Sequence, residues 1–147
     1  MLNLIKLIGT EGSTEYTAAL EIQSALISLW PEIESSSSDE DLVLITVGQP
    51  ISGYATKELD IVILANFKTP KYFRPTSYLK DKENKKIENS NFIYVENFVA
   101  VIEEKSHPAD KVNINGNVVS VLYKNGWHSA TDQNMKQMHS LREYFLD

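Results

Sequence analysis

The chain has 147 residues, of which 42% are hydrophobic and 23% charged, proportions typical of a single soluble globular domain. It contains no cysteine, which excludes disulfides and zinc–thiolate sites and favours a cytoplasmic location. The net charge of −6 argues against binding of nucleic acid through bulk positive charge. We expect no signal peptide and no membrane span, because no basic leader and no apolar run of roughly 20 residues is present.

The first regular element predicted is a helix over residues 13–30. Its apolar residues recur at helical spacing, and Ser13 or Thr14 can cap its first turn. Pro31 follows directly and predicts the end of the helix, since proline cannot continue the hydrogen-bond pattern.

Two apolar strands are predicted next, after a serine-rich loop over 34–41. The first strand covers residues 42–47, and the second covers residues 58–64. The second strand is apolar on both faces except at Asp60, which is typical of a strand in the middle of a sheet.

Residues 66–91 form a polar, lysine-rich segment for which we expect little regular structure. Two prolines interrupt it, and residues 68–88 carry seven basic and three acidic side chains, a formal charge of +4. Such a segment is either a phosphate-contacting loop or a solvated loop, and its aromatic residues could stack bases or pin the loop to the domain.

The remainder predicts a strand over 92–104, a hairpin over 112–121 and a helix over 132–146. The hairpin prediction depends on the pair Asn115-Gly116, which favours a tight turn. The apolar residues expected on the buried side of the helix are Met135, Met138, Leu141 and Phe145. This order of elements predicts one α/β domain spanning residues 1–147, with a central mixed sheet flanked by helices.

The strand over 92–104 ends in two glutamates after an apolar run, and Lys105 follows them directly. Glu103 and Lys105 lie two positions apart and therefore project to the same side of a strand. An acid and an ammonium there are costly unless they pair with each other or with a ligand. The pattern fits either a surface ion pair or a metal-dependent phosphodiesterase site, in which lysine steadies the attacking water or the phosphate.

Asp60 is the second candidate site residue. If its strand lies beside the one that ends at Glu103, both carboxylates reach one pocket and supply two oxygen ligands to a single Mg²⁺. The backbone carbonyl of Glu104, between Glu103 and Lys105, is a natural additional metal ligand.

Glu15 and Gln133 are weaker candidates near the starts of the two helices. Glu15 is explained by the helix dipole alone, but a carboxylate aimed at the pocket would help to orient a metal-bound water. Gln133 is either an exposed helix residue or an amide donor to a phosphate or a ligand carboxylate, and Gln137, one turn later, is the rival for this role.

Five pieces of sequence occur in an order that resembles a known family. They are Gly12-x-x-Glu15, Glu58-Leu59-Asp60, Val101-Ile102-Glu103-Glu104-Lys105, Trp127 and Gln133. From about Gly9 to Leu141 the chain resembles the PD-(D/E)xK nucleases, and among them the nuclease-related (NERD-type) domains. It departs from the pattern at Leu59, where the motif has proline, and in the length of the segment between Asp60 and Glu103.

The resemblance implies a restriction-endonuclease-like fold and an Mg²⁺- or Mn²⁺-dependent DNA nuclease, often part of a larger protein or a defence system. It implies direct attack of a metal-activated water on phosphorus without a covalent intermediate. The catalytic set it implies is Glu15, Asp60, Glu103, Lys105 and Gln133, with Asp60, Glu103 and Glu104 at the metal. An RNase, and a catalytically silent domain that binds nucleic acid or a partner protein, stay open as alternatives, as does a homodimer.

Overall fold

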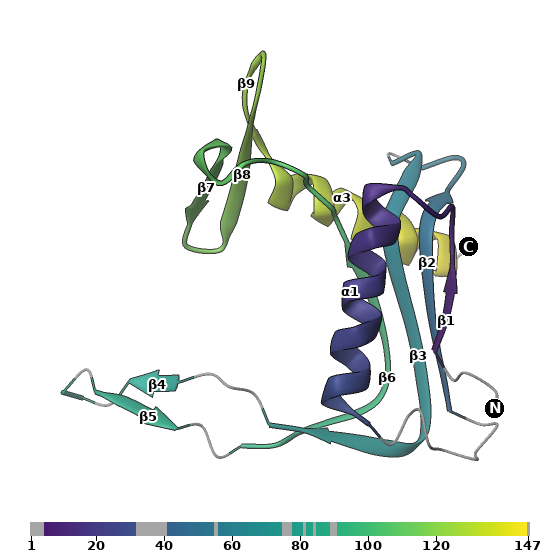
Figure 1. The fold of residues 1–147 in the computed structure, drawn as a ribbon, viewed down its shortest axis with the longest axis vertical. Helices are drawn as coiled ribbons and strands as arrows, with labels where there is room; N and C mark the ends of the chain where they lie inside the picture. The colour runs from purple at the N-terminus through teal and green to yellow at the C-terminus, as the bar shows by residue number, and fades with distance from the viewer. Residues whose placement is uncertain are drawn as a thin grey trace.

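The computed structural model describes residues 5–31, 41–54, 56–74, 78–80, 82–83, 85–88 and 91–146. The centre of the described chain is a mixed four-stranded sheet in the order β1-β2-β3-β6 (Figure 1). These strands are β1 (Ile5–Ile8), β2 (Leu42–Pro50), β3 (Glu58–Phe73) and β6 (Ile93–Ile102). β1 runs parallel to β2, whereas β3 is antiparallel to both of its neighbours. The expected α/β class with a central mixed sheet is confirmed.

Helix α1 (Thr14–Leu29) covers one face of the sheet (Figure 1). The predicted cap is present, because the Ser13 hydroxyl accepts a hydrogen bond from the amide of Tyr16 at 3.0 Å. Trp30, directly after the helix, is buried and packs edge-to-face on Phe67, with ring centroids 5.5 Å apart. The main apolar core therefore lies between α1 and the central strands.

Helix α3 (Ala130–Leu146) lies against β8 and β6, and near its C-terminal end Leu141 packs on the sheet face opposite α1. The prediction that Met135, Met138 and Phe145 face the core was wrong, since all three are exposed. Leu141 is buried as expected, together with two polar residues of the same helix, Gln137 and Ser140. The helix therefore buries a partly polar strip.

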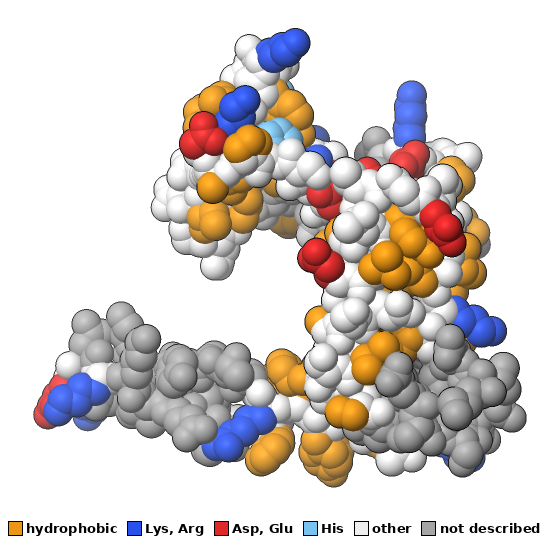
Figure 2. Space-filling model, viewed as in Figure 1, with side chains coloured by type: hydrophobic (Ala, Val, Ile, Leu, Met, Phe, Trp, Pro, Cys, Tyr) orange, Lys and Arg blue, Asp and Glu red, His pale blue; other side chains and the backbone are white. Residues whose placement is uncertain are grey.

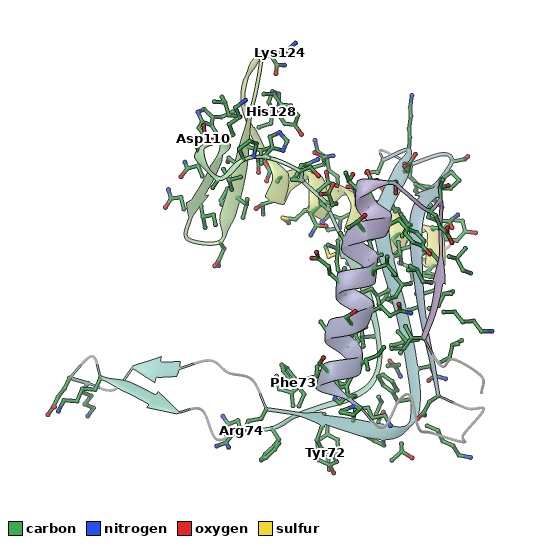
Figure 3. All side chains as sticks on the ribbon, viewed as in Figure 1. Tyr72, Phe73, Arg74, Asp110, Lys124 and His128 are labelled. Carbon is green, nitrogen blue, oxygen red and sulfur yellow. The ribbon has the colours of Figure 1, made fainter. Side chains whose placement is uncertain are left out.

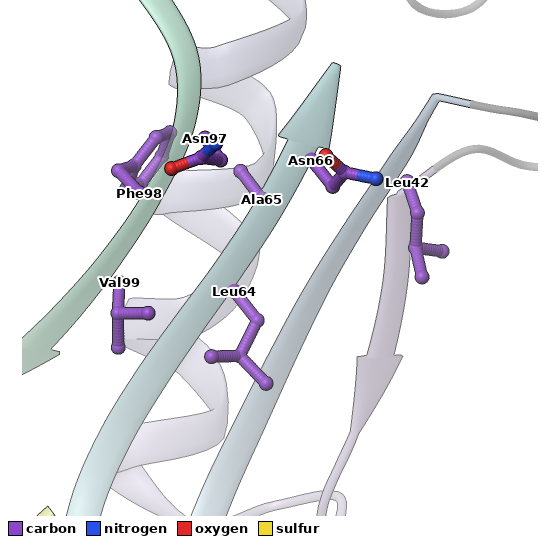
Figure 4. Close-up of a pocket in the computed structure, with 7 residues that line it drawn as sticks. All are labelled: Leu42, Leu64, Ala65, Asn66, Asn97, Phe98 and Val99. Carbon is purple, nitrogen blue, oxygen red and sulfur yellow. The ribbon is translucent and has the colours of Figure 1, made fainter. Parts of the chain in front are cut away.

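Among the described residues, no further helix covers the rest of this sheet face. A shallow groove of about 200 Å³ crosses it between β2, β3 and β6 (Figure 4). Its lining residues are Leu42, Leu64, Ala65, Asn66, Asn97, Phe98 and Val99. The second layer thus covers only part of the sheet.

The segment 66–91 contains more regular structure than the sequence predicted. β3 continues through Pro70 to Phe73, and β4 (Tyr78–Lys80) and β5 (Lys86–Glu88) form a separate two-stranded ribbon that projects from the domain (Figure 1). Pro70 is tolerated because it falls where the register between β3 and β6 shifts, so that no regular ladder bond is lost.

Lys71 of this segment has a structural role. Its ammonium lies 3.3 Å from the carboxylate of Asp41, and the two side chains are only 9% and 5% exposed. The other oxygen of Asp41 accepts a hydrogen bond from the amide of Lys68 at 2.8 Å. This pair holds the extended end of β3 against the start of β2.

A small antiparallel sheet precedes α3. A single 3₁₀ turn, Ala109–Lys111, leads into β7 (Val112–Asn115), β8 (Val118–Tyr123) and β9 (Gly126–Ser129). The predicted hairpin is confirmed, with Gly116 in the left-handed region at φ +60°. We call residues 112–129 the β7–β9 lobe. Neither helix in the described ranges is long and apolar enough to span a membrane.

Replacing Asp41 by alanine is expected to lower the free energy of unfolding by about 3–5 kcal/mol, because it leaves the ammonium of Lys71 buried without its partner. Chemical denaturation followed by circular dichroism measures the change. Glu83→Ala is the matched control, since it breaks the exposed Lys85–Glu83 pair and is expected to change stability little. Equal effects of the two substitutions would contradict the role given to Asp41.

Candidate functional site

Two carboxylates meet where the central strands end. Ile61 of β3 pairs with Ile102 of β6, and this register sets the preceding Asp60 beside the following Glu103. β6 ends at Ile102, so Glu103 begins a non-helical, non-strand segment, and the strand is shorter than the predicted range 92–104. The expected convergence of Asp60 and Glu103 is present.

Gln137 joins the two carboxylates. Its side-chain nitrogen donates hydrogen bonds to Glu103 Oε2 and to Asp60 Oδ1, the latter at 3.4 Å. Its side-chain oxygen accepts from the amide of Asp60 at 3.4 Å, and the residue is 2% exposed. α3 is therefore tied to the site by a buried glutamine.

The sequence assigned an amide contact of this kind to Gln133, which lies one turn earlier and is exposed. The structure therefore corrects this choice in favour of the rival, Gln137. The sequence does contain a pattern that favours Gln137. It lies four positions before Leu141, the one correctly predicted core residue of α3, and therefore on the same side of the helix.

Lys105 forms an ion pair with Glu103 Oε1, with the two side chains 19% and 3% exposed. Burial raises the pKa of Glu103, and the charge of Asp60 raises it further; the hydrogen bond from Lys105 opposes both but does not cancel them. Burial lowers the pKa of Lys105, but its contacts with Glu103 and Tyr123 outweigh that effect and leave this pKa raised. Lys105 is therefore held as an ammonium ion beside Glu103, a carboxyl group whose ionisation is disfavoured by burial.

The backbone of Glu104 also reaches this site. Its amide donates to Asp60 Oδ2 at 3.0 Å, while its carboxylate accepts from the hydroxyl of Ser106 at 2.7 Å. The hydrogen bond from Glu104 to Asp60 thereby holds the segment after β6 to β3. A role for the Glu104 carbonyl as a metal ligand stays a prediction.

Glu15 lies in the first turn of α1 and is partly exposed. Hydrogen bonding to its own backbone amide lowers the pKa of Glu15; burial opposes this, and hydrogen bonds with Ser13 and Thr14 and the positive charge of Lys105 assist it. Glu15 is thus within electrostatic range of Lys105. The described contacts do not include a direct bond between them.

Sequence reasoning missed one neighbour of Lys105. Tyr123, at the end of β8, lies close enough to the ammonium to help raise the pKa of Lys105. Its ring packs edge-to-face on His107 and on His128, with centroids 4.9 Å and 5.2 Å apart. No spacing signal marks Tyr123, because it comes from a separate sheet and reaches the site only through the fold.

The residues present fit a hard divalent cation with an incomplete protein shell. No three His, Cys, Asp or Glu side chains of the described ranges are grouped as metal ligands. Mg²⁺, however, is commonly held by one or two carboxylates with water completing its shell. Asp60 and Glu103 both bond to the same nitrogen of Gln137, so their oxygens converge as those of shared ligands do.

Comparison of the chain with protein-family models, with curated proteins and with solved structures found no match. The resemblance to PD-(D/E)xK nucleases stays a prediction that depends on the motif residues.

Gln137→Ala is expected to lower the free energy of unfolding by about 1–3 kcal/mol, because it leaves buried groups of Asp60 and Glu103 without their partner. Gln133→Ala is the matched control on the same helix, and its effect should stay within about 0.5 kcal/mol. Denaturation of both variants in parallel checks the assignment. A larger effect from Gln133 would restore the original choice.

The stability of the protein should also depend on pH through Glu103. Because its pKa is raised, the folded protein holds the proton more tightly than the unfolded chain does, so the free energy of unfolding falls as pH rises through that pKa. The Glu103→Gln side chain cannot ionise, so this variant does not show the fall in the free energy of unfolding that ionisation of Glu103 causes. Thermal unfolding in chelator should therefore show the variant gaining on wild type as pH rises above about 4, the ordinary pKa of a glutamate. A difference that is constant or shrinks over this range would contradict the raised pKa.

Proposed function

We propose that this chain is a metal-dependent DNA nuclease domain of the PD-(D/E)xK type, with the restriction-endonuclease-like arrangement that the resemblance implies. The observation that carries the proposal is the partly buried set of Asp60, Glu103 and Lys105, all in mutual contact or linked through Gln137. Two acids and a lysine are costly to bury, so a protein gains little from this arrangement unless a ligand uses it.

Each residue has a distinct proposed role. Asp60 and Glu103 would hold Mg²⁺ or Mn²⁺, with the Glu104 carbonyl as the third protein ligand. A bound cation of this kind lowers the pKa of a water and neutralises phosphate charge. Lys105 donates to the scissile phosphate and steadies the attacking hydroxide, and Gln137 keeps the two carboxylates aligned.

Glu15 has a supporting role at the edge of this site. Its carboxylate interacts electrostatically with Lys105 and can accept a hydrogen bond from a water molecule that enters between the two side chains. We place the activity in the cytoplasm, the compartment that a chain without cysteine favours.

A catalytically silent docking domain is the second candidate, and one observation favours it. Apolar side chains remain uncovered on the open sheet face and on α3, among them Leu42, Val99 and Met138. Such a surface is typical of contact with another protein. This surface does not, however, explain why the two carboxylates converge on Gln137.

The test is cleavage of supercoiled plasmid and of a labelled single strand with Mg²⁺, Mn²⁺ or EDTA. Wild type is expected to cut only with metal, and Lys105→Ala should fall to background because the phosphate loses its ammonium. Lys136→Ala, which removes an exposed lysine of α3, is the matched control and should cut like wild type.

Metal binding separates the two candidates. Mn²⁺ should raise the thermal midpoint of wild type and not that of Asp60→Ala, since only the former has both carboxylates. Cleavage by Lys105→Ala at the wild-type rate would remove the role given to the lysine. A wild type with neither cleavage nor stabilisation by Mn²⁺ would favour the docking domain.

A further inference from the structure

The β7–β9 lobe adjoins the candidate site through a series of rings. His107, Tyr123 and His128 stand edge-to-face in that order, with successive centroids 4.9 Å and 5.2 Å apart. Tyr123, the middle ring, lies beside Lys105, and His128, at one end of the series, is exposed. In Figure 3, His128 lies on the lobe below Lys124 at its tip.

These rings are accessible from the site. Tyr123 is 40% exposed, so part of its ring remains open although two other rings pack against it. Figure 2 shows a hollow beneath the lobe, with acidic side chains on its wall. A strand that places a phosphate beside Lys105 would bring the adjoining nucleotide against Tyr123.

The charge of this region differs from that of the rest of the chain. Residues 105–129 carry three lysines and one aspartate, a formal charge of +2, within a protein of net charge −6. Two positive charges are too few for a surface that binds a duplex mainly through its phosphates. Aromatic rings beside a few lysines are instead typical of surfaces that stack unpaired bases, irrespective of sequence.

We propose that the β7–β9 lobe binds single-stranded DNA by stacking an unpaired base on Tyr123, beside the phosphate held at Lys105. This inference rests on the proposed function and deepens it, since it names the substrate as a single strand or an unpaired region. In a duplex the faces of each base are already covered by its neighbours, so the ring of Tyr123 has no base face to contact.

The exposed tyrosines at the base of the ribbon are the rival surface. Tyr72 and Tyr94 are cross-strand partners with their rings 4.1 Å apart, and both are largely exposed. Tyr72 and Tyr94 lie at the opposite end of β3 from Asp60, so a base stacked on them would not be next to the acidic pair. Tyr94 is therefore a matched control for Tyr123.

The experiment measures binding of a fluorescein-labelled oligothymidylate, and of a labelled duplex of equal length, by anisotropy. The full chain is used with Ca²⁺ in place of Mg²⁺. Wild type should prefer the single strand, and Tyr123→Ala should weaken this binding at least about fivefold, the lower end of the effect of removing one stacking ring. Tyr123→Phe keeps the ring and should bind within about twofold of wild type, as should Tyr94→Ala.

His128→Ala keeps the test decisive if Tyr123→Ala does not fold, because His128 is exposed; it should weaken binding of the single strand but not of the duplex. The proposal is overturned if wild type binds no single strand, if it prefers the duplex, or if Tyr94→Ala loses as much affinity as the lobe variants. Failure of the proposed function is recognised separately. Tyr123-dependent binding without cleavage under Mg²⁺ or Mn²⁺ would remove the nuclease assignment and leave the binding surface.

Discussion

Glu103 holds a carboxylate that is almost entirely removed from water, and the structure around it is arranged to make that burial tolerable. Lys105 supplies a positive charge from two residues further on, and Gln137 supplies an N–H donor from a helix far along the chain. The same glutamine bonds to Asp60, so one side chain connects β3, the end of β6 and α3. The candidate site is thus also the joint between the sheet and its second helix.

The parts that sequence could predict are those set by local pattern. Helix α1 has helical spacing and a serine cap, and β2, β3 and β6 contain apolar runs, so each of these was identifiable without knowing its neighbours. The short edge strand β1 was not predicted. Asp60 and Glu103 were identifiable for a related reason, because a charge inside or at the end of an apolar strand needs a partner. Their meeting follows once the two strands are neighbours in antiparallel register.

The parts that sequence could not predict depend on how elements dock. The buried strip of α3 follows from where the helix crosses the sheet, and it selects Gln137 over Gln133 and leaves Met135 and Met138 exposed. Lys71 gave no sign that it was a core residue, since its partner Asp41 lies in a different element. Counting lysines along residues 68–88 therefore overstated the positive charge that this segment presents to solvent.

The position of Lys105 beside Glu103 and Tyr123 bears on the two roles proposed for this lysine, which are to stabilise the fold and to contact a phosphate. Its ammonium pairs with the Glu103 carboxylate just beyond the end of β6, and Tyr123 of the β7–β9 lobe lies beside it. A second positive charge bound to Glu103 would weaken the ion pair by competition and repulsion. The ammonium would then remain at the mouth of the site and gain bonding capacity toward an incoming phosphate. Tyr123 lies beside this ammonium, so the β7–β9 lobe borders the acidic pair.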